Sequence, residues 1–278
     1  MKSILLTLFV ALTVFGADAQ DLKLPALSPT ARISQDFSTS AIDIVYSRPS
    51  MRGRRIFGDL VAYGQVWRTG ANAATKVKFG EDVTVGGQEI KAGEYALYTI
   101  PGQGSWEVIL NKGTSNWGSS GYSKAEDVAR FRIKTKYVDD LVHSFTINIS
   151  HITFNACKID LSWEHTMVSI PVKANNEERL NTAIDKAINN PSIPYFQAAN
   201  YYFETKQQTD KAWEYVNKAI EQNPKAFYMQ YLKARIAQKM GKREEAIAAA
   251  EKSIELAKGS AYEDDYRRQN MKIIRALR

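Results

Sequence analysis

Hydrophobic and polar residues alternate with a period of two from about Ala31 to Val172, and residues typical of turns separate the short runs. Such alternation predicts strands that bury one face. Many short strands with no helical period between them favour an antiparallel β-sandwich or jelly-roll. The runs we expect to be strands are AIDIVYS, TKVKF, EYALYTI, SWEVIL, ARFRIKTKYV, HSFTINIS, CKIDLSW and TMVSIPV.

One tight hairpin is predicted inside this region. Val83–Val85 and Gln88–Ile90 flank Gly86-Gly87, and two adjacent glycines accept the positive φ angles of a primed turn. The alternation around Cys157, the only cysteine, turns its side chain inward, so we expect a small core residue and no internal disulfide.

After Pro171 the period changes to steps of three and four residues, and Ala, Lys, Glu and Gln become frequent. Ala212 and Ala246 occupy matching places in two amphipathic segments, an offset of 34 residues, which is the period of tetratricopeptide repeats. We therefore predict an α+β multidomain chain, with a β-sandwich domain over residues 20–173 and a short α-helical, tetratricopeptide-like repeat domain over 174–278. Flanking helices are expected near Glu177–Asn189 and Ala261–Leu277.

The first 19 residues are typical of a secretory signal peptide. Lys2 precedes an apolar run from Ile4 to Phe15, and Ala17-Asp18-Ala19 supplies a small-x-small ending. The apolar run is shorter than the roughly 20 residues that span a bilayer. We expect an exported mature chain without a membrane span, and export makes nucleic acid a poor partner.

Positive charge is moderate overall, at +7, but it is concentrated in two loop-like stretches. YSRPSMRGRRIFG, residues 46–58, carries Arg48 and Arg54, and VWRTGANAAT, residues 66–75, carries Trp67, Arg68 and Asn72. Guanidinium groups bind carboxylate, sulfate or phosphate through paired hydrogen bonds, and an adjacent indole offers a surface for a sugar ring. These five residues are therefore our candidate ligand-binding site, with the arginines holding an anionic group, Trp67 stacking and Asn72 orienting.

A structural role for the same arginines is an equal alternative. Arg48 and Arg68 would then bond loop carbonyls, or pair with Asp59 and Asp82, while Trp67 packs beneath them. A second basic stretch, in which Arg130, Arg132, Lys134 and Lys136 alternate with apolar residues, is better explained as the solvated face of a strand than as a polyanion site.

Motifs for catalysis are sparse. The histidines His143, His151 and His165 lack the spacing of a helical zinc site, so no metal and no cofactor is predicted. NWGSSGY, residues 116–122, lacks the spacing of a serine nucleophile motif, and we interpret it as a loop whose Trp117 is pinned to the domain. Catalytic residues stay unassigned.

Several long motifs, in order, resemble a known family: YSRPSMRGRRIFG, VWRTGANAATKVKF, AGEYALYTIPG and SWEVILNKG. The family consists of exported bacterial proteins and is called domain-of-unknown-function family 2911; the resemblance covers roughly Pro25–Val172. It implies a periplasmic or secreted location in a Gram-negative bacterium, and it carries no established activity or catalytic residue.

The leading hypothesis is thus an exported, two-domain binding protein. Its arginine loops would hold an anionic small molecule or glycan, and its helical repeats would dock a protein partner. The alternative is a periplasmic hydrolase that acts on a carbohydrate or envelope polymer, which would need a carboxylate pair or a histidine near the same loops.

Overall fold

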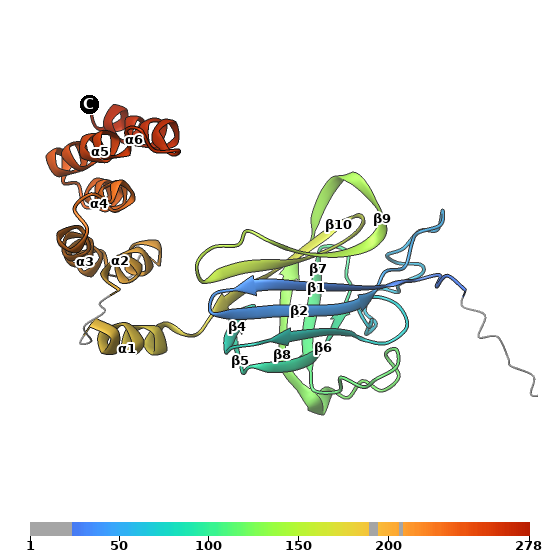
Figure 1. The fold of residues 1–278 in the computed structure, drawn as a ribbon. Helices are drawn as coiled ribbons and strands as arrows, with labels where there is room; N and C mark the ends of the chain where they lie inside the picture. The colour runs from blue at the N-terminus through green and yellow to red at the C-terminus, as the bar shows by residue number, and fades with distance from the viewer. Residues whose placement is uncertain (1–23, 189–193, 206–207) are drawn as a thin grey trace, which may run out of the picture.

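The computed structural model describes residues 24–188, 194–205 and 208–278, so the predicted signal peptide lies outside the described residues. Within this part of the chain, ten strands are followed by six α-helices (Figure 1). The predicted order, a strand-rich half before a helical half, is confirmed. None of the helices in the described part combines the length and apolarity that crossing a bilayer requires.

Every strand pairing is antiparallel, and the strands form two sheets. One sheet has six strands in the order β1-β2-β3-β6-β7-β8, and the other has four in the order β5-β4-β10-β9. The strands are β1 Thr30–Phe37, β2 Ser40–Ser47, β3 Thr75–Phe79, β4 Val83–Val85, β5 Gln88–Ile90, β6 Gly93–Ile100, β7 Ser105–Asn111, β8 Asp127–Lys134, β9 Lys136–Ser150 and β10 Ala156–Ala174.

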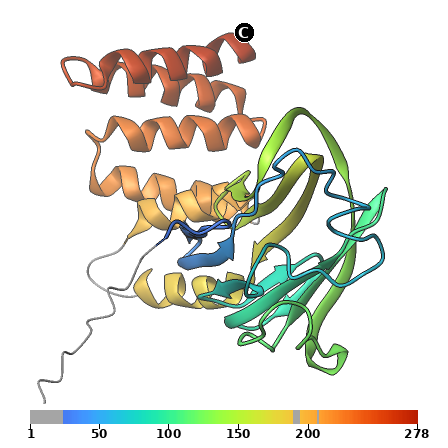
Figure 2. The same cartoon turned by 90° about the vertical axis from the view of Figure 1, so that its right-hand side faces the viewer.

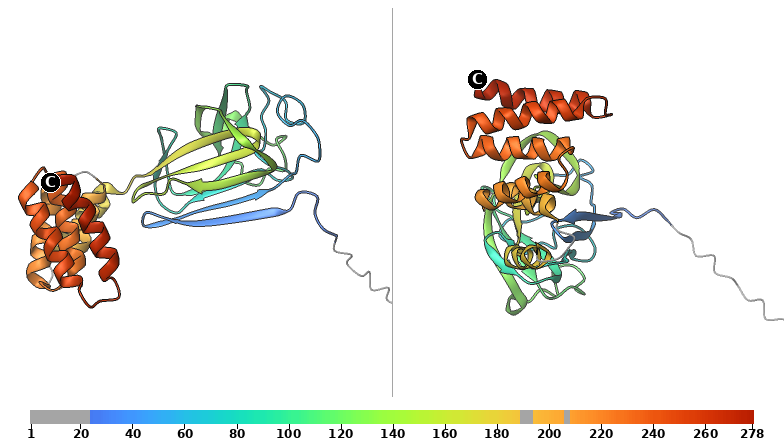
Figure 3. Two further views of the ribbon diagram at one scale, coloured as in Figure 1. Left: turned by 90° about the horizontal axis from the view of Figure 1, so that it is seen from above. Right: turned by 60° about the vertical axis from the view of Figure 1, so that its left-hand side comes forward.

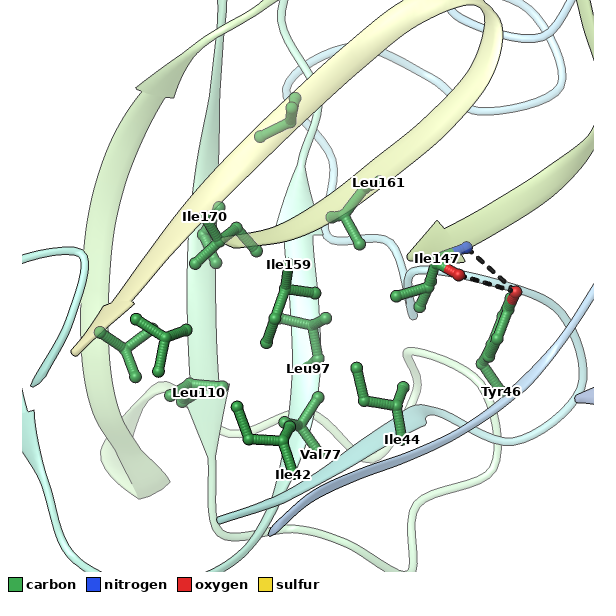
Figure 4. Packing of buried hydrophobic residues seen from close by; sticks show 14 of the residues in the cluster. Ile42, Ile44, Tyr46, Val77, Leu97, Leu110, Ile147, Ile159, Leu161 and Ile170 are labelled. Atoms are coloured by element: carbon green, nitrogen blue, oxygen red, sulfur yellow. Dashed lines mark hydrogen bonds between the residues drawn. The ribbon is translucent and has the colours of Figure 1, made fainter. Parts of the chain in front are cut away.

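The core of the sandwich fills the space between the inner faces of the two sheets (Figure 4). Ile42, Ile44 and Leu97 of the six-stranded sheet belong to one buried cluster with Ile159 and Leu161 of the four-stranded sheet. Alternating positions on each strand supply these side chains, which is why period two was visible in the sequence. Cys157 belongs to the same cluster, as predicted.

The predicted hairpin is confirmed as β4 and β5. Val83 pairs with Ile90, and Gly86 and Gly87 have φ angles of 57° and 88°. Because β4 lies beside β10, the chain leaves the six-stranded sheet after β3 and returns to it with β6.

Three strand predictions need correction. ARFRIKTKYV is not one strand, because β8 ends at Lys134 and β9 begins at Lys136 in the other sheet. CKIDLSW and TMVSIPV join into one long strand, β10, which has register shifts around Glu164. The first strand, β1, was not among the predicted runs, although its burial alternates as in the others.

The helices are α1 Glu177–Ile188, α2 Tyr195–Glu204, α3 Thr209–Gln222, α4 Phe227–Lys239, α5 Arg243–Ala257 and α6 Glu263–Leu277. From α2 to α6 they stack one against the next (Figure 2), and Leu180 and Ile184 of α1 pack against the buried cluster that begins this stack. The offset of 34 residues corresponds to equivalent buried positions: Ala212, Val216 and Ala219 on α3 match Ala246, Ala250 and Ser253 on α5. These positions face neighbouring helices in both repeats, as in a solenoid in which each unit packs on the next.

The helical half joins the sandwich directly after β10 (Figure 3). Just before α1, the Asn176 side chain donates 2.7 Å hydrogen bonds to Ser38 Oγ and to Glu81 Oε2. Arg179, on α1, donates from Nη2 to the same Glu81 oxygen at 3.2 Å. Phe154, between β9 and β10, packs against Tyr201 of α2 with ring centroids 5.5 Å apart. The start of the helical half is thus fastened to the sandwich by a polar cluster around Glu81.

Candidate functional site

All five predicted site residues lie in, or at the start of, the long connection between β2 and β3, residues 48–74. Its first part runs along β9, the edge strand of the four-stranded sheet. Phe145 N–H donates to the carbonyl of Pro49 at 2.9 Å, and Met51 N–H donates to the carbonyl of His143 at 2.8 Å. The connection therefore bridges the two sheets and covers hydrogen-bonding groups that an edge strand would otherwise expose.

Arg48 fastens this bridge to β9. Its Nε donates to the carbonyl of Phe145 at 3.2 Å, and its Nη2 donates to Thr146 Oγ1 at 2.8 Å. Arg48 therefore has the structural role considered above, in which an arginine donates hydrogen bonds to protein groups. Asp82, one of the carboxylates considered as an arginine partner, pairs instead with Lys91 at 2.8 Å.

Arg54 makes local contacts of a similar kind. Its Nε donates to the carbonyl of Met51 and its Nη2 to the carbonyl of Ser50, each at 2.9 Å. These bonds fix the guanidinium without neutralising it, because both acceptors are uncharged. The side chain is exposed and lines a cavity described below.

Trp67 is a core residue with 8% of its surface exposed. Its indole N–H donates to the carbonyl of Gly70 at 3.0 Å, and its ring lies nearly parallel to that of Trp163, with centroids 6.0 Å apart. Phe57, Trp106 and Phe145 complete the aromatic cluster around it. Such burial leaves little of the ring free for stacking on a sugar, the role predicted for it.

The turn after Trp67 adopts a backbone conformation that side chains with a Cβ rarely take. Thr69 and Asn72 have φ angles of 53° and 59°. Buried threonines hold it: Thr69 Oγ1 lies 3.1 Å from Thr99 Oγ1, and Thr75 Oγ1 donates to the carbonyl of Thr69 at 2.6 Å. A strained conformation persists only where its surroundings over-determine it, so this turn is rigid.

Asn72 fastens this turn to neighbouring segments through hydrogen bonds. Its Nδ2 donates to Ser47 Oγ at 3.2 Å and to the carbonyl of Ser28 at 3.4 Å. Its own carbonyl accepts a 3.1 Å hydrogen bond from the N–H of Gly118, which brings a second loop against the turn.

Arg68 differs from the other arginines of the site. Among the described residues its guanidinium has no hydrogen-bond or ion-pair partner, and its Nε is buried. A Cβ placed on Gly118 would lie 3.2 Å from Arg68 Nη1, so this glycine leaves the space that the guanidinium needs. The side chain is held between two loops with its hydrogen-bonding capacity unused.

Arg130, from the basic stretch at residues 130–136, has the charged partners that Arg68 lacks within the described residues. Its guanidinium contacts Glu107 and Tyr122, and lies 2.8 Å from Asp127 Oδ2. Burial, followed by the hydrogen bond to Asp127, raises the pKa of Tyr122 to about 12. Carboxylates on β7 and β8 thus neutralise Arg130, whereas Arg132, Lys134 and Lys136 are exposed to solvent, as predicted for a solvated strand face.

A cavity of about 340 Å³ brings part of the predicted site together. Arg54, Trp67 and Arg68 line it, whereas Arg48 and Asn72 are not among its lining residues. The other lining residues were not predicted as site residues; they are Ser28, Pro49, Leu60, Val61, Gly70, Ala71 and Trp163. Trp163 comes from β10, about a hundred residues away, and no local pattern connects it with Arg68.

The prediction that Trp117 is pinned to the domain is wrong. Its side chain is 71% exposed, although the loop that carries it is hydrogen-bonded to the Asn72 turn through Gly118. The pairing of Ala73 with Trp117 brings this loop, through Gly118, close to Arg68, and local sequence does not show that pairing.

His151 and Cys157, whose side chains could in principle take part in catalysis or bind a metal, do not line the Arg68 cavity. His151 lines a separate cavity together with Thr84 and Cys157. Burial raises the pKa of the Cys157 thiol to about 11, so it is protonated at neutral pH. Within the described residues, no three His, Cys, Asp or Glu side chains gather as metal ligands.

The comparisons with known proteins agree with this two-part organisation. Residues 28–172, just over half of the chain, match the model of a family described as protein of unknown function (DUF2911). The chain belongs to the DUF2911 family. The DUF2911 region extends from just before β1 into β10, so it contains the sandwich and the Arg68 cavity.

A second match covers residues 141–262, from within β9 to the end of α5 and slightly beyond. Its model is described as N-terminal acetyltransferase A, auxiliary subunit. The predicted tetratricopeptide-like character of the helices that follow the DUF2911 region is confirmed. No curated protein matches the chain.

Proposed function

We propose that this protein is an exported binding protein whose DUF2911 domain holds an anionic ligand at Arg68. The observation that carries the proposal is the buried Nε of Arg68, which has no hydrogen-bond partner among the described residues. A buried donor left unsatisfied costs about 1–3 kcal/mol, and more when the group is charged. A bound carboxylate, sulfate or phosphate would supply the missing acceptor.

The surroundings of Arg68 support a site for an anion. Arg54 lines the same cavity and brings a second positive charge, which no carboxylate in the described part of the chain neutralises. Glu164, the acidic residue next to Trp163, directs its carboxylate to the backbone N–H groups of Ile56 and Phe57, at 2.8 and 3.3 Å. Two fixed guanidinium groups without a paired acid favour a ligand that brings its own negative charge.

The cavity also indicates the size of the ligand. At about 340 Å³ it lies at the lower end of ordinary small-molecule pockets. Leu60, Val61, Trp67 and Trp163 contribute apolar atoms beside the arginines, but the exposed lining is mainly polar. A small anion, or the charged group of a larger molecule, suits this lining.

Thermal unfolding of the purified protein tests the proposal with sulfate, phosphate and galacturonate as probes. A ligand at a hundred times its dissociation constant adds about 2.7 kcal/mol of stability, a shift of roughly 5 °C or more for a domain of this size. Arg68→Gln should abolish the shift, because it removes the guanidinium and its charge while keeping a polar side chain. Arg55→Gln, an exposed arginine of the same loop that does not line the cavity, is the matched control. Equal shifts in the parent and in Arg68→Gln would refute an anion site at Arg68.

The helical half and the location complete the proposal. The tetratricopeptide-like helices suit protein interaction in general, and we propose that they dock a protein partner. The signal-peptide pattern supports export to the periplasm or beyond. Hydrolysis of a carbohydrate or envelope polymer stays the alternative prediction, and it would need an acidic residue or a histidine that the described lining of this cavity does not contain.

A further inference from the structure

Trp117 stands out among the described side chains because it is a large aromatic group that is 71% exposed. Isolated apolar residues on a surface are common and need no explanation by themselves. Two further observations set this one apart: its loop is held by several hydrogen bonds, and the next residue, Gly118, approaches Arg68.

The loop that carries Trp117 is held by hydrogen bonds at several points. Ala74 N–H donates to the carbonyl of Asn116 at 3.3 Å, and Ser120 Oγ donates to the carbonyl of Trp117 at 3.2 Å. The Asn116 side chain donates to the carbonyl of Gly121 at 2.9 Å and to the Tyr98 hydroxyl at 3.2 Å. Because the backbone is held, only the two side-chain torsions of Trp117 have to be ordered when a ligand binds, which reduces the entropy cost of binding.

The same loop touches the anion site. Gly118, next to Trp117 in the chain, lies close enough to Arg68 that an added Cβ would be 3.2 Å from Nη1. Its N–H also donates to the carbonyl of Asn72, four residues beyond Arg68. The exposed indole thus belongs to the residue directly before the one that approaches the unpaired guanidinium of Arg68.

We infer that the ligand is an acidic saccharide, with one sugar ring stacked on Trp117 and a carboxylate of the saccharide bound by Arg68. This inference rests on the proposed anion site. A flat indole face matches the C–H face of a pyranose ring, and a guanidinium matches a carboxylate through two hydrogen bonds. The net charge of +7 adds long-range attraction for a polyanionic chain. A single indole offers far less apolar area than a segment that inserts into a bilayer, so a glycan is favoured over a lipid surface.

Isothermal titration calorimetry of the purified protein with trigalacturonic acid tests the inference. Trp117→Ala should weaken binding about tenfold, the usual order for loss of one aromatic contact. Arg68→Gln should abolish binding, and the fully methyl-esterified trisaccharide should not bind, because its carboxylates are neutralised. Tyr137→Ala removes an aromatic side chain of similar exposure, 73%, from β9 and should leave the affinity unchanged.

The outcomes separate this inference from the proposed function. If sulfate still stabilises the protein through Arg68 but Trp117→Ala binds trigalacturonic acid as tightly as the parent, the saccharide inference is overturned and the anion site stands. If Arg68→Gln changes neither sulfate nor trigalacturonic acid binding, both fail. Binding to phosphatidylglycerol vesicles that depends on Trp117, without any binding of trigalacturonic acid, would overturn the inference in favour of a lipid headgroup.

Discussion

Arg48 is bonded to Thr146: its Nη2 donates a 2.8 Å hydrogen bond to Oγ1 of a residue 98 positions further along the chain. Together with the bond from Nε to the Phe145 carbonyl, this contact ties the β2–β3 connection to the edge strand β9. A residue predicted to hold a ligand thus joins the two sheets.

Arg48→Ala should therefore destabilise the sandwich. Loss of two hydrogen bonds from a charged donor is expected to lower the free energy of unfolding by roughly 2–3 kcal/mol, a fall in melting temperature of several degrees. Urea unfolding monitored by tryptophan fluorescence measures it. Arg55→Ala, in the same loop, serves as the control and should change stability by less than about 0.5 kcal/mol. An unchanged unfolding midpoint in Arg48→Ala would contradict the structural role.

Gly86 and Gly87 form a matched pair in the β4–β5 turn. Both have positive φ, so alanine at either position carries a backbone cost of roughly 1–2 kcal/mol. A Cβ at Gly86 would also lie 2.3 Å from the Phe131 ring, whereas one at Gly87 meets nothing within 4 Å. Gly86→Ala should therefore be the more destabilising of the two by at least about 1 kcal/mol in chemical denaturation. Equal losses would show that Phe131 moves aside freely.

The polar cluster around Glu81 is expected to control the attachment of α1. Glu81 Oε2 accepts hydrogen bonds from Thr39 Oγ1 at 2.9 Å, Asn176 Nδ2 at 2.7 Å and Arg179 Nη2 at 3.2 Å. Glu81→Ala leaves these donors without their acceptor, at a cost of roughly 1–3 kcal/mol.

Hydrogen exchange resolved along the chain provides the measurement for Glu81→Ala. Amides of α1 should exchange faster, while those of α4 and α5 keep their protection. Glu89→Ala, an exposed acid on the neighbouring β5, should leave α1 unchanged. Unaltered exchange in α1 after Glu81→Ala would mean that its contacts with the sandwich are held by other residues.

Cys157 gives a prediction about pH. Because burial raises the pKa of its thiol from 9.0 to about 11, the folded state keeps the proton that the unfolded state releases first. The stability due to this group is complete below about pH 9 and is lost as the pH rises through 11. Cys157→Ala should therefore show a shallower loss of stability between these pH values than the parent. Burial raises the pKa of Tyr122 and Tyr202 to about 12 in both proteins, so the comparison isolates the thiol.

Thiol labelling checks the same burial independently. Cys157 should resist a disulfide reagent at pH 8 in the folded protein and react fully in urea. Fast labelling of the folded protein would show that the thiol is accessible.

Sequence periodicity predicted those elements whose side chains follow a local rule. The β4–β5 hairpin followed from two glycines, and the repeated helices followed from the offset that relates Ala212 to Ala246. The break at Thr135 escaped prediction because Arg132, Lys134 and Lys136 continue one alternation while the chain passes from one sheet to the other. The exposure of Trp117 could not be predicted for a similar reason, since the sequence of a loop does not show which distant segments pack over its side chains.

By itself, the sequence determined the strand-rich and helical halves and drew attention to the arginines, because burial on one face imposes a period on any strand or helix. Tertiary structure alone decided that Arg68, unlike Arg48 and Arg130, keeps a buried Nε without a hydrogen-bond partner among the described residues. Arg48 donates a hydrogen bond to the carbonyl of Phe145, and Arg130 forms ion pairs with Glu107 and Asp127. The buried Nε of Arg68 has no acceptor among the described residues. Such partners lie on segments distant in the chain, so whether they are positioned near a given arginine depends on how the two sheets pack and not on any local sequence pattern.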